Sequence, residues 1–181
     1  MMQGDPLFHK VIRKKFYFFT NCHWLSVMKP IPAYSNMAIS FTFVSHVSTM
    51  HITYSSTIKP TPQQIIDLYE SAGLVRPTKD FDRIKKMYDN SNLIVTAWDG
   101  DLLVGVSRSL TDFCYACYLS DLAVHQDYKK AGIGKQMVEL TREIIGEESM
   151  LLLLSAPLAM EYYPKIGMNT VTNGFIIPRN K

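Results

Sequence analysis

The chain has 181 residues, of which 47% are hydrophobic and 19% are charged, and its formal net charge is +3 at pH 7. This length fits one domain with or without a tail, and the apolar content suffices for a core, which excludes an intrinsically disordered chain. No apolar run approaches the roughly 20 residues of a membrane-spanning helix, so we expect neither a membrane span nor a membrane partner.

The first 49 residues differ from the rest of the chain in charge and pattern. They contain five Lys or Arg and one acidic residue, whereas residues 50–181 contain 14 basic and 15 acidic residues. The main part of the chain therefore lacks the positive patch of a nucleic-acid-binding domain. A signal peptide fits residues 1–49 poorly, because Asn21, Cys22 and His23 interrupt its apolar stretch. We predict a non-catalytic extension over 1–49 and one domain over 50–181.

Hydrophobic periodicity predicts a series of strands and helices from Met50 onward. A strand begins at Met50, a helix begins after the N-cap Thr61 and ends at Gly73, and a second helix covers about 81–88. The Asp-Gly pair at 99–100 lies between two apolar runs, which is typical of a β-hairpin. The later expected elements are strands at 93–98, 102–110 and 116–124, a helix at 133–145, a strand at 150–155, a short helix at 159–163 and a final hairpin of strands 170–172 and 175–177. This order predicts an α/β domain.

The clearest chemical signature lies at 119–135, where a predicted strand runs into a helix through a glycine-bearing turn. Gly132 and Gly134 stand where free backbone N–H groups and the positive end of a helix dipole meet, which favours binding of a phosphate group. A P-loop needs four residues between its glycines and a Ser or Thr where Gln136 stands. A dinucleotide-binding fingerprint needs a third Gly where Met137 stands. Both of these alternatives fit poorly.

Two motifs here resemble those of the GCN5-related N-acetyltransferase (GNAT) family. They are Lys129-x-x-Gly132-x-Gly134, which follows a strand ending in Leu-Ala-Val, and Ala159-x-x-x-Tyr163-x-x-x-Gly167-Met168. The first is similar to the family's pyrophosphate loop, and the second to a later motif at the expected distance. The resemblance covers about 50–178 and implies a mixed, mostly antiparallel central sheet, flanked by helices and splayed between its fourth and fifth strands.

This resemblance also implies a reaction and its participants. Acetyl-CoA is the implied acetyl donor, and a primary amine of a small molecule or peptide attacks it directly in a ternary complex. The implied cofactor-binding residues are Leu122, Ala123, Val124, Lys129, Lys130, Ala131, Gly132, Ile133, Gly134 and Lys135. Tyr163 matches the family's tyrosine that protonates the departing thiolate. A phenol can serve as this proton donor because its pKa of about 10 keeps it protonated at neutral pH. A backbone N–H near Ala123 or Val124 is the expected oxyanion donor.

The base and the acceptor site are open at this stage. An alkyl ammonium with a pKa of about 10.4 needs help to lose its proton, and the candidate bases are Asp121 and Asp112. Alternatively, Asp121 hydrogen-bonds a splayed strand and Asp112 begins a turn. Arg108 either holds a substrate carboxylate or faces solvent. Tyr162 either lines the acceptor pocket or, as we expect, packs in the core.

Several further expectations concern the environment of the protein. The chain has three cysteines, Cys22, Cys114 and Cys117, and this odd number argues against a disulfide framework. We therefore expect a cytoplasmic location, and we expect Cys114 and Cys117 to be packed. The histidines show no ligand spacing, so we predict no metal. We expect a homodimer with the final hairpin as its interface. The alternative functions are a non-catalytic acyl-CoA-binding module and a transferase with another donor, such as succinyl-CoA.

Overall fold

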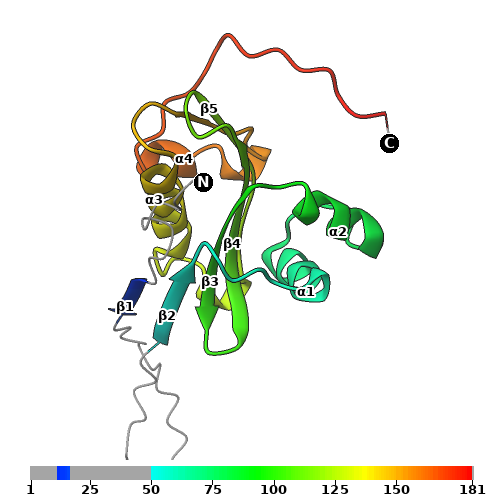
Figure 1. Cartoon of the computed structure of the whole chain (residues 1–181), viewed down its shortest axis with the longest axis vertical. Coiled ribbons are helices and arrows are strands. Elements are labelled where there is room, and N and C mark those ends of the chain that lie inside the picture. The colour runs from blue at the N-terminus through cyan, green and yellow to red at the C-terminus, as the bar shows by residue number, and fades with distance from the viewer. Residues whose placement is uncertain (1–11, 17–49, 181) are drawn as a thin grey trace, which may run out of the picture.

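The computed structural model describes residues 12–16 and 50–180, and these form a six-stranded sheet with helices on both faces (Figure 1). The strands lie in chain order, and neighbours are antiparallel except β5 and β6, which are parallel. Their bounds are β1 Ile12–Phe16, β2 Met50–Ser55, β3 Leu93–Asp99, β4 Leu102–Thr111, β5 Ala116–Val124 and β6 Met150–Leu152. The predicted α/β class and mixed, mostly antiparallel sheet are confirmed.

The helices are arranged in two layers around this sheet. Helices α1 and α2 cover one face and α3 covers the other, while α4 follows β6 (Figure 1). Their bounds are α1 Pro62–Ala72, α2 Phe81–Asp89, α3 Ile133–Ile145 and α4 Tyr162–Lys165, with short 3-10 turns at Gln126–Tyr128 and Pro157–Ala159. Among the described helices, none combines the length and the hydropathy needed to cross a membrane.

Local signals explain why α1 begins and ends where it was predicted. The Gln64 N–H donates to the Thr61 hydroxyl at 3.3 Å, and the Thr61 N–H donates back to the Gln64 side chain at 2.9 Å. This reciprocal capping box satisfies two N–H groups that the first helical turn leaves without a partner. Gly73 ends the helix with φ of 71°, a left-handed conformation that costs glycine little.

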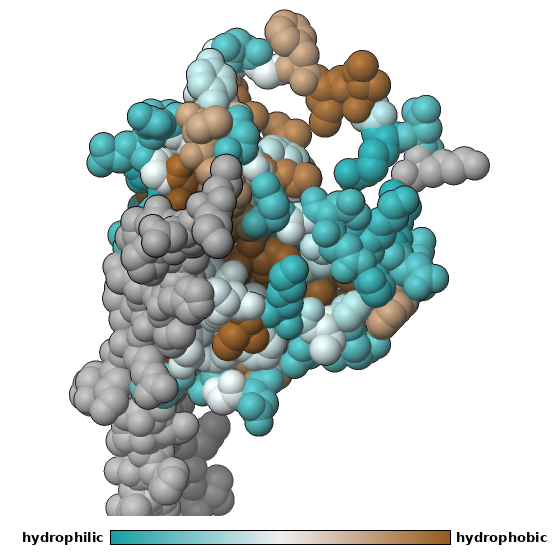
Figure 2. Space-filling view, in the orientation of Figure 1, coloured by the Kyte–Doolittle hydropathy of each residue, from teal (hydrophilic) through white to brown (hydrophobic). Residues whose placement is uncertain are grey.

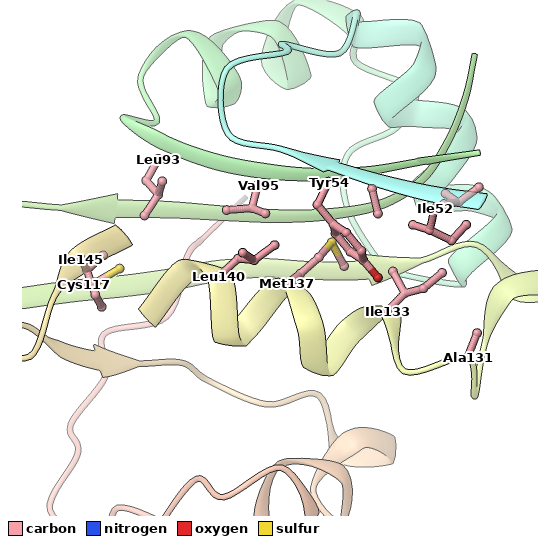
Figure 3. Packing of buried hydrophobic residues seen from close by; sticks show 12 residues of the cluster. Ile52, Tyr54, Leu93, Val95, Cys117, Ala131, Ile133, Met137, Leu140 and Ile145 are labelled. Carbon is pink, nitrogen blue, oxygen red and sulfur yellow. The ribbon is translucent and has the colours of Figure 1, made fainter. Parts of the chain in front are cut away.

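The core consists of two hydrophobic clusters, one on each face of the sheet. Figure 3 shows the cluster under α3, where Ile133, Met137 and Leu140 point from the helix toward the sheet. A Cβ at Gly105 of β4 would lie 2.9 Å from the end of the Met137 side chain, so the absence of a side chain there lets α3 approach closely. This packing fixes the start of α3 beside the end of β5.

The sheet opens between β5 and β6, as predicted for the fourth and fifth strands counted from Met50. Their pairing runs only from Ala116–Met150 to Tyr118–Leu152, although β5 continues to Val124. In the same region the register between β4 and β5 shifts after Arg108, which leaves Ser120 without a partner on β4. A bulge of this kind increases strand twist and helps one strand diverge from its neighbour.

The structure differs from the prediction at four places, the first being the strand predicted at 150–155, since β6 ends at Leu152. Strand β1 lies within the N-terminal segment for which no element was expected, because its sequence IRKKF has no period-two alternation. The final hairpin at 170–177 is wrong, since this segment is extended, exposed and unpaired among the described residues (Figure 1). The short helix predicted at 159–163 is replaced by the 3-10 turn Pro157–Ala159 and by α4. Turns and helices can be predicted from neighbouring residues, whereas a strand also depends on the edge of another strand with which it can pair. The strand predictions were therefore the less secure ones.

Candidate functional site

The start of α3 presents open backbone amides. Its N-cap Gly132 has φ of 78° and makes no side-chain capping bond. The first bond of the helix runs from the Gln136 N–H to the Gly132 carbonyl at 3.0 Å, so the amides of Ile133, Gly134 and Lys135 precede it and have no acceptor within the helix. These amides and the positive end of the helix dipole suit an anionic group such as a pyrophosphate.

The three lysines around this loop have different surroundings. Lys129 donates through Nζ to the Ala72 carbonyl at 3.1 Å, which ties the loop to the end of α1. Lys135 Nζ lies 3.7 Å from Glu139 on the next turn of α3. Lys130 is exposed and has a left-handed φ of 67°. Of the three, Lys130 is therefore the best placed to add positive charge to a ligand at the loop.

The end of β5 leads directly into this loop and has a free backbone edge. The His125 N–H donates to the Val104 carbonyl of β4 at 2.9 Å. Because successive residues of a strand direct their N–H groups to opposite sides, the N–H and C=O groups of Leu122 and Val124 point away from β4, toward the opening beside β6. The end of β5 at 122–124 and the glycine loop at 129–135, the two predicted sets of cofactor-binding residues, therefore form one continuous stretch of backbone along the opening. Of the two predicted oxyanion donors, the Val124 N–H points outward and the Ala123 N–H does not.

Both predicted tyrosines lie on α4, in different surroundings. Burial raises the pKa of Tyr163 and the charge of Arg76 opposes this rise, so the phenol is protonated at neutral pH. The ring of Tyr162 meets that of Tyr163 edge-on, with centroids 5.3 Å apart. A Cβ at Gly134 would lie 2.7 Å from the Tyr162 hydroxyl. Tyr162 therefore lies over the start of α3, and the expectation that it packs in the core is wrong.

A cavity of about 1010 Å³ adjoins Tyr163 on the β6 side of the opening. Its walls come from the C-terminal half of α3, from residues 150–155, from α4 and from 167–171. Leu151, Leu152 and Leu153 supply much of its apolar lining. This volume is within the range of small-molecule and cofactor pockets.

Asp121 and Arg108 belong to a buried polar cluster beneath α1 and α2. Asp121 accepts hydrogen bonds from Arg108 Nε, from Arg76 Nε at 2.5 Å and from the Tyr69 hydroxyl at 2.9 Å. Arg108 also donates to Ser91 Oγ at 2.8 Å and to Ser120 Oγ at 2.7 Å. Arg108 is buried and committed to protein groups, so it neither faces solvent nor is available to a substrate carboxylate, which corrects both sequence alternatives.

Arg76, Tyr69 and Tyr88 complete this cluster, and sequence reasoning missed all three. The hydroxyl groups of Tyr69 and Tyr88 are 2.7 Å apart, and burial raises the pKa of both phenols, so both are neutral. Arg76 and Tyr69 lie 45 and 52 residues from Asp121 in the chain, and no local pattern links them. The only sequence signal for Arg76 was that a charged residue stands between the apolar pair Leu74 and Val75 and the proline Pro77.

The two candidate bases are both occupied by hydrogen-bond donors. Asp121 is fully buried and bound by two guanidinium groups and a phenol, which favours its structural alternative over a base. The exposed Asp112 accepts three backbone N–H bonds, from Cys114, Tyr115 and Ala116, and these lower its pKa to about 2. It joins β4 to β5 at the end of β5 remote from the glycine loop, which favours the turn alternative. Cys114 in this turn is exposed, so the prediction that it is packed is wrong.

The fold and site define a class of protein: an α/β domain whose sheet opens between two parallel strands beside an uncapped, glycine-bearing helix start, as in acyl-CoA-dependent acyltransferases. The chain belongs to the GNAT family, since the model of the acetyltransferase (GNAT) family matches residues 63–168, more than half of its length.

Relatives and solved structures agree with this assignment. The chain is 26% identical over 117 residues to an uncharacterised N-acetyltransferase, ycf52-like, of Prochlorococcus marinus, and the match covers 61% of this chain and 64% of that protein. A Staphylococcus aureus protein of unknown function, SA2161, described as a probable acetyltransferase, superposes with a TM-score of 0.61 at 24% identity, covering 71% of this chain and 99% of that one. An aminoglycoside N-acetyltransferase, AAC(6')-Iy, crystallised with CoA, superposes with a TM-score of 0.56 at 10% identity, covering 72% and 96%. At these identities, the two structures show the shared fold.

Proposed function

We propose that this protein transfers an acetyl group from acetyl-CoA to the primary amine of a small molecule or peptide, by direct attack in a ternary complex. The observation that carries the proposal is the free edge of β5 at Leu122 and Val124, which leads into the open amides at the start of α3. Acetyl-CoA supplies the acetyl group as a thioester. The bound CoA in the structural relative AAC(6')-Iy supports this choice of donor.

Each part of the path has a distinct task in this proposal. The outward-pointing backbone groups of Leu122 and Val124 bind the extended arm of the donor, much as a neighbouring strand would. The amides of 133–135 bind its pyrophosphate, and Lys130 adds positive charge. The Val124 N–H stabilises the oxyanion. Tyr163 donates a proton to the departing sulfur, and water takes the proton of the amine because Asp121 and Asp112 already accept bonds from protein groups.

Calorimetric titration tests the donor directly. We expect acetyl-CoA and CoA to bind with micromolar affinity, whereas NAD and ATP do not bind. Gly132→Ala should weaken CoA binding at least tenfold, because alanine in a left-handed conformation costs about 1–2 kcal/mol and the loop would relax away from it.

Gly146→Ala is a matched control for that substitution. Gly146 ends α3 with φ of 77° and ψ of 177°, a conformation that only glycine adopts readily, so alanine there is strained at least as much as at Gly132, at the other end of the same helix. We expect both variants to melt at lower temperature and only Gly132→Ala to lose affinity. No binding of acetyl-CoA by the wild type, or equal loss of affinity in both variants, would contradict the proposed site.

The predicted homodimer is also part of the proposal. Every described residue after Ile145 is at least partly exposed. Figure 2 shows hydrophobic side chains along the extended C-terminal segment. The large exposed apolar residues of this region are Met150, Leu154, Leu158, Met160, Tyr162, Val171, Phe175, Ile176 and Ile177. A second copy would remove this surface from water.

The cytoplasmic location stays a prediction from cysteine content.

Light scattering after size-exclusion chromatography measures this association. We expect the mass of a dimer for the wild type and of a monomer for Phe175→Ser combined with Ile177→Ser, because polar side chains remove the driving force for burial. Val75→Ser, at an equally exposed apolar residue of the α1–α2 connection, should stay dimeric. A monomeric wild type at all concentrations would rule the dimer out.

A further inference from the structure

The buried cluster around Asp121 has an unbalanced charge. It contains two guanidinium groups, Arg76 and Arg108, and one carboxylate, and the phenols of Tyr69 and Tyr88 are neutral. Among the described residues, this cluster therefore carries one net positive charge. Positive charge held in a largely buried place is costly unless an anion comes close to it.

Arg76 is the member of the cluster that a ligand can reach. Its side chain is 26% exposed, whereas those of Arg108 and Asp121 are 7% and 0% exposed. Nε donates to Asp121, Nη2 to the Ser120 carbonyl at 2.9 Å and Nη1 to the Val75 carbonyl at 2.7 Å. A guanidinium has five N–H groups, so two of them have no acceptor among the described residues.

The guanidinium of Arg76 lies beyond the part of β5 that we assign to the donor, because Nη2 contacts the Ser120 carbonyl, four residues before Val124. Ser120 is the bulged residue of β5, just beyond Tyr118, where pairing with β6 ends, and it stands two residues before Leu122 at the free edge. The charge of Arg76 also reaches Tyr163 on the other side of the opening, where it acts on the pKa of the phenol. Arg76 thus lies at the inner end of the path that we assign to the donor, far along β5 from the pyrophosphate loop.

We propose that Arg76 binds a carboxylate of one of the two reactants at the opening between β5 and β6. The inference rests on the proposed acyl transfer and specifies its substrate class. A planar guanidinium fork is the protein group best suited to a carboxylate, and Asp121 and the Ser120 carbonyl hold the fork in one orientation. The carboxylate belongs either to the acceptor, as in an amino acid, or to a dicarboxylic acyl donor, as in succinyl-CoA.

A bound carboxylate compensates the net positive charge of the cluster, so Arg76 orients an amino-acid acceptor and does not itself activate the amine. Water takes the proton of that amine, because Asp121 already accepts hydrogen bonds from Arg76, Arg108 and Tyr69.

Two comparisons on the wild-type protein separate the two sources of the carboxylate. In the first, the CoA-saturated protein is titrated with the standard amino acids and with their carboxamides, and kcat/KM is measured with acetyl-CoA for those that bind. In the second, succinyl-CoA is titrated against butyryl-CoA, which has the same acyl length and no carboxylate. We expect at least a tenfold preference for the carboxylate in one comparison. No preference in either would overturn the inference.

Three variants then assign the preference to Arg76. Arg76→Gln should abolish it, and Arg76→Lys should retain part of it, because lysine keeps the charge and loses the fork. Arg179→Gln makes the same change of charge on the exposed C-terminal segment and should leave the preference intact. CoA affinity and melting temperature identify misfolded variants. A preference that survives in folded Arg76→Gln would overturn the inference, whereas wild-type protein that binds no CoA would contradict the proposed function instead.

Discussion

Tyr163→Phe should lower kcat for acetyl transfer at least 100-fold and leave the affinity for acetyl-CoA within about twofold. General acid catalysis typically increases the rate about 100-fold or more. Phenylalanine keeps the packing of the ring and removes the hydroxyl proton that Tyr163 would donate. Burial raises the pKa of Tyr163, so the wild-type phenol carries its proton over the whole neutral range. Single-turnover kinetics with saturating donor, together with calorimetric binding of acetyl-CoA, measure the two quantities separately.

Tyr115→Phe serves as the control for this substitution. Tyr115 is 76% exposed in the turn between β4 and β5, at the end of β5 remote from the glycine loop, and loss of its hydroxyl should change neither kcat nor affinity. Unchanged turnover in Tyr163→Phe would remove Tyr163 from the mechanism. Loss of donor affinity in step with kcat would instead make its hydroxyl a binding group.

Asp121→Asn should reduce the free energy of unfolding by about 3–5 kcal/mol. Removal of one partner from a buried ion pair leaves the other charge without compensation, and here two guanidinium groups lose the same carboxylate. Asparagine retains one acceptor oxygen, and it carries no charge. Urea unfolding followed by tryptophan fluorescence measures the change.

The exposed ion pair of Asp89 and Lys85 provides the control. It joins adjacent turns of α2 at 2.5 Å, with both side chains 56% exposed, so Asp89→Asn should cost at most about 0.5 kcal/mol. The comparison also tests the structural role of Asp121. If Asp121→Asn were as stable as the wild type, the structural role of the carboxylate would be wrong.

Much of the fold was predictable because its signals are local in sequence. The capping box of α1, the Asp-Gly turn between β3 and β4, and the helix after Gly132 each depend on residues within a few positions of one another. The glycine loop could be recognised for the same reason, since one short segment supplies its amides. Tyr163 could be proposed as the proton donor because a second motif stands at a fixed distance along the chain.

The strands at the two ends of the chain were not predictable in this way. The pairing of β1 with β2 depends on an edge that only the folded sheet provides, and its sequence has no alternation to reveal it. The apolar segment at 170–177 has turn and strand residues, and it remains unpaired among the described residues. Strand formation depends on partners distant in sequence, so propensity alone misplaced both.

The sequence by itself determined the order of the central elements and the glycine-bearing start of α3, because each depends on residues that are neighbours in the chain. Only the tertiary structure decided the surroundings of Asp121 and Arg108. It brought Arg76 and Tyr69 from the helical layer to a carboxylate on β5, turned Arg108 away from any ligand and left Arg76 at the opening. The reason is that charge balance in a buried place depends on side chains that meet only after helices pack on the sheet.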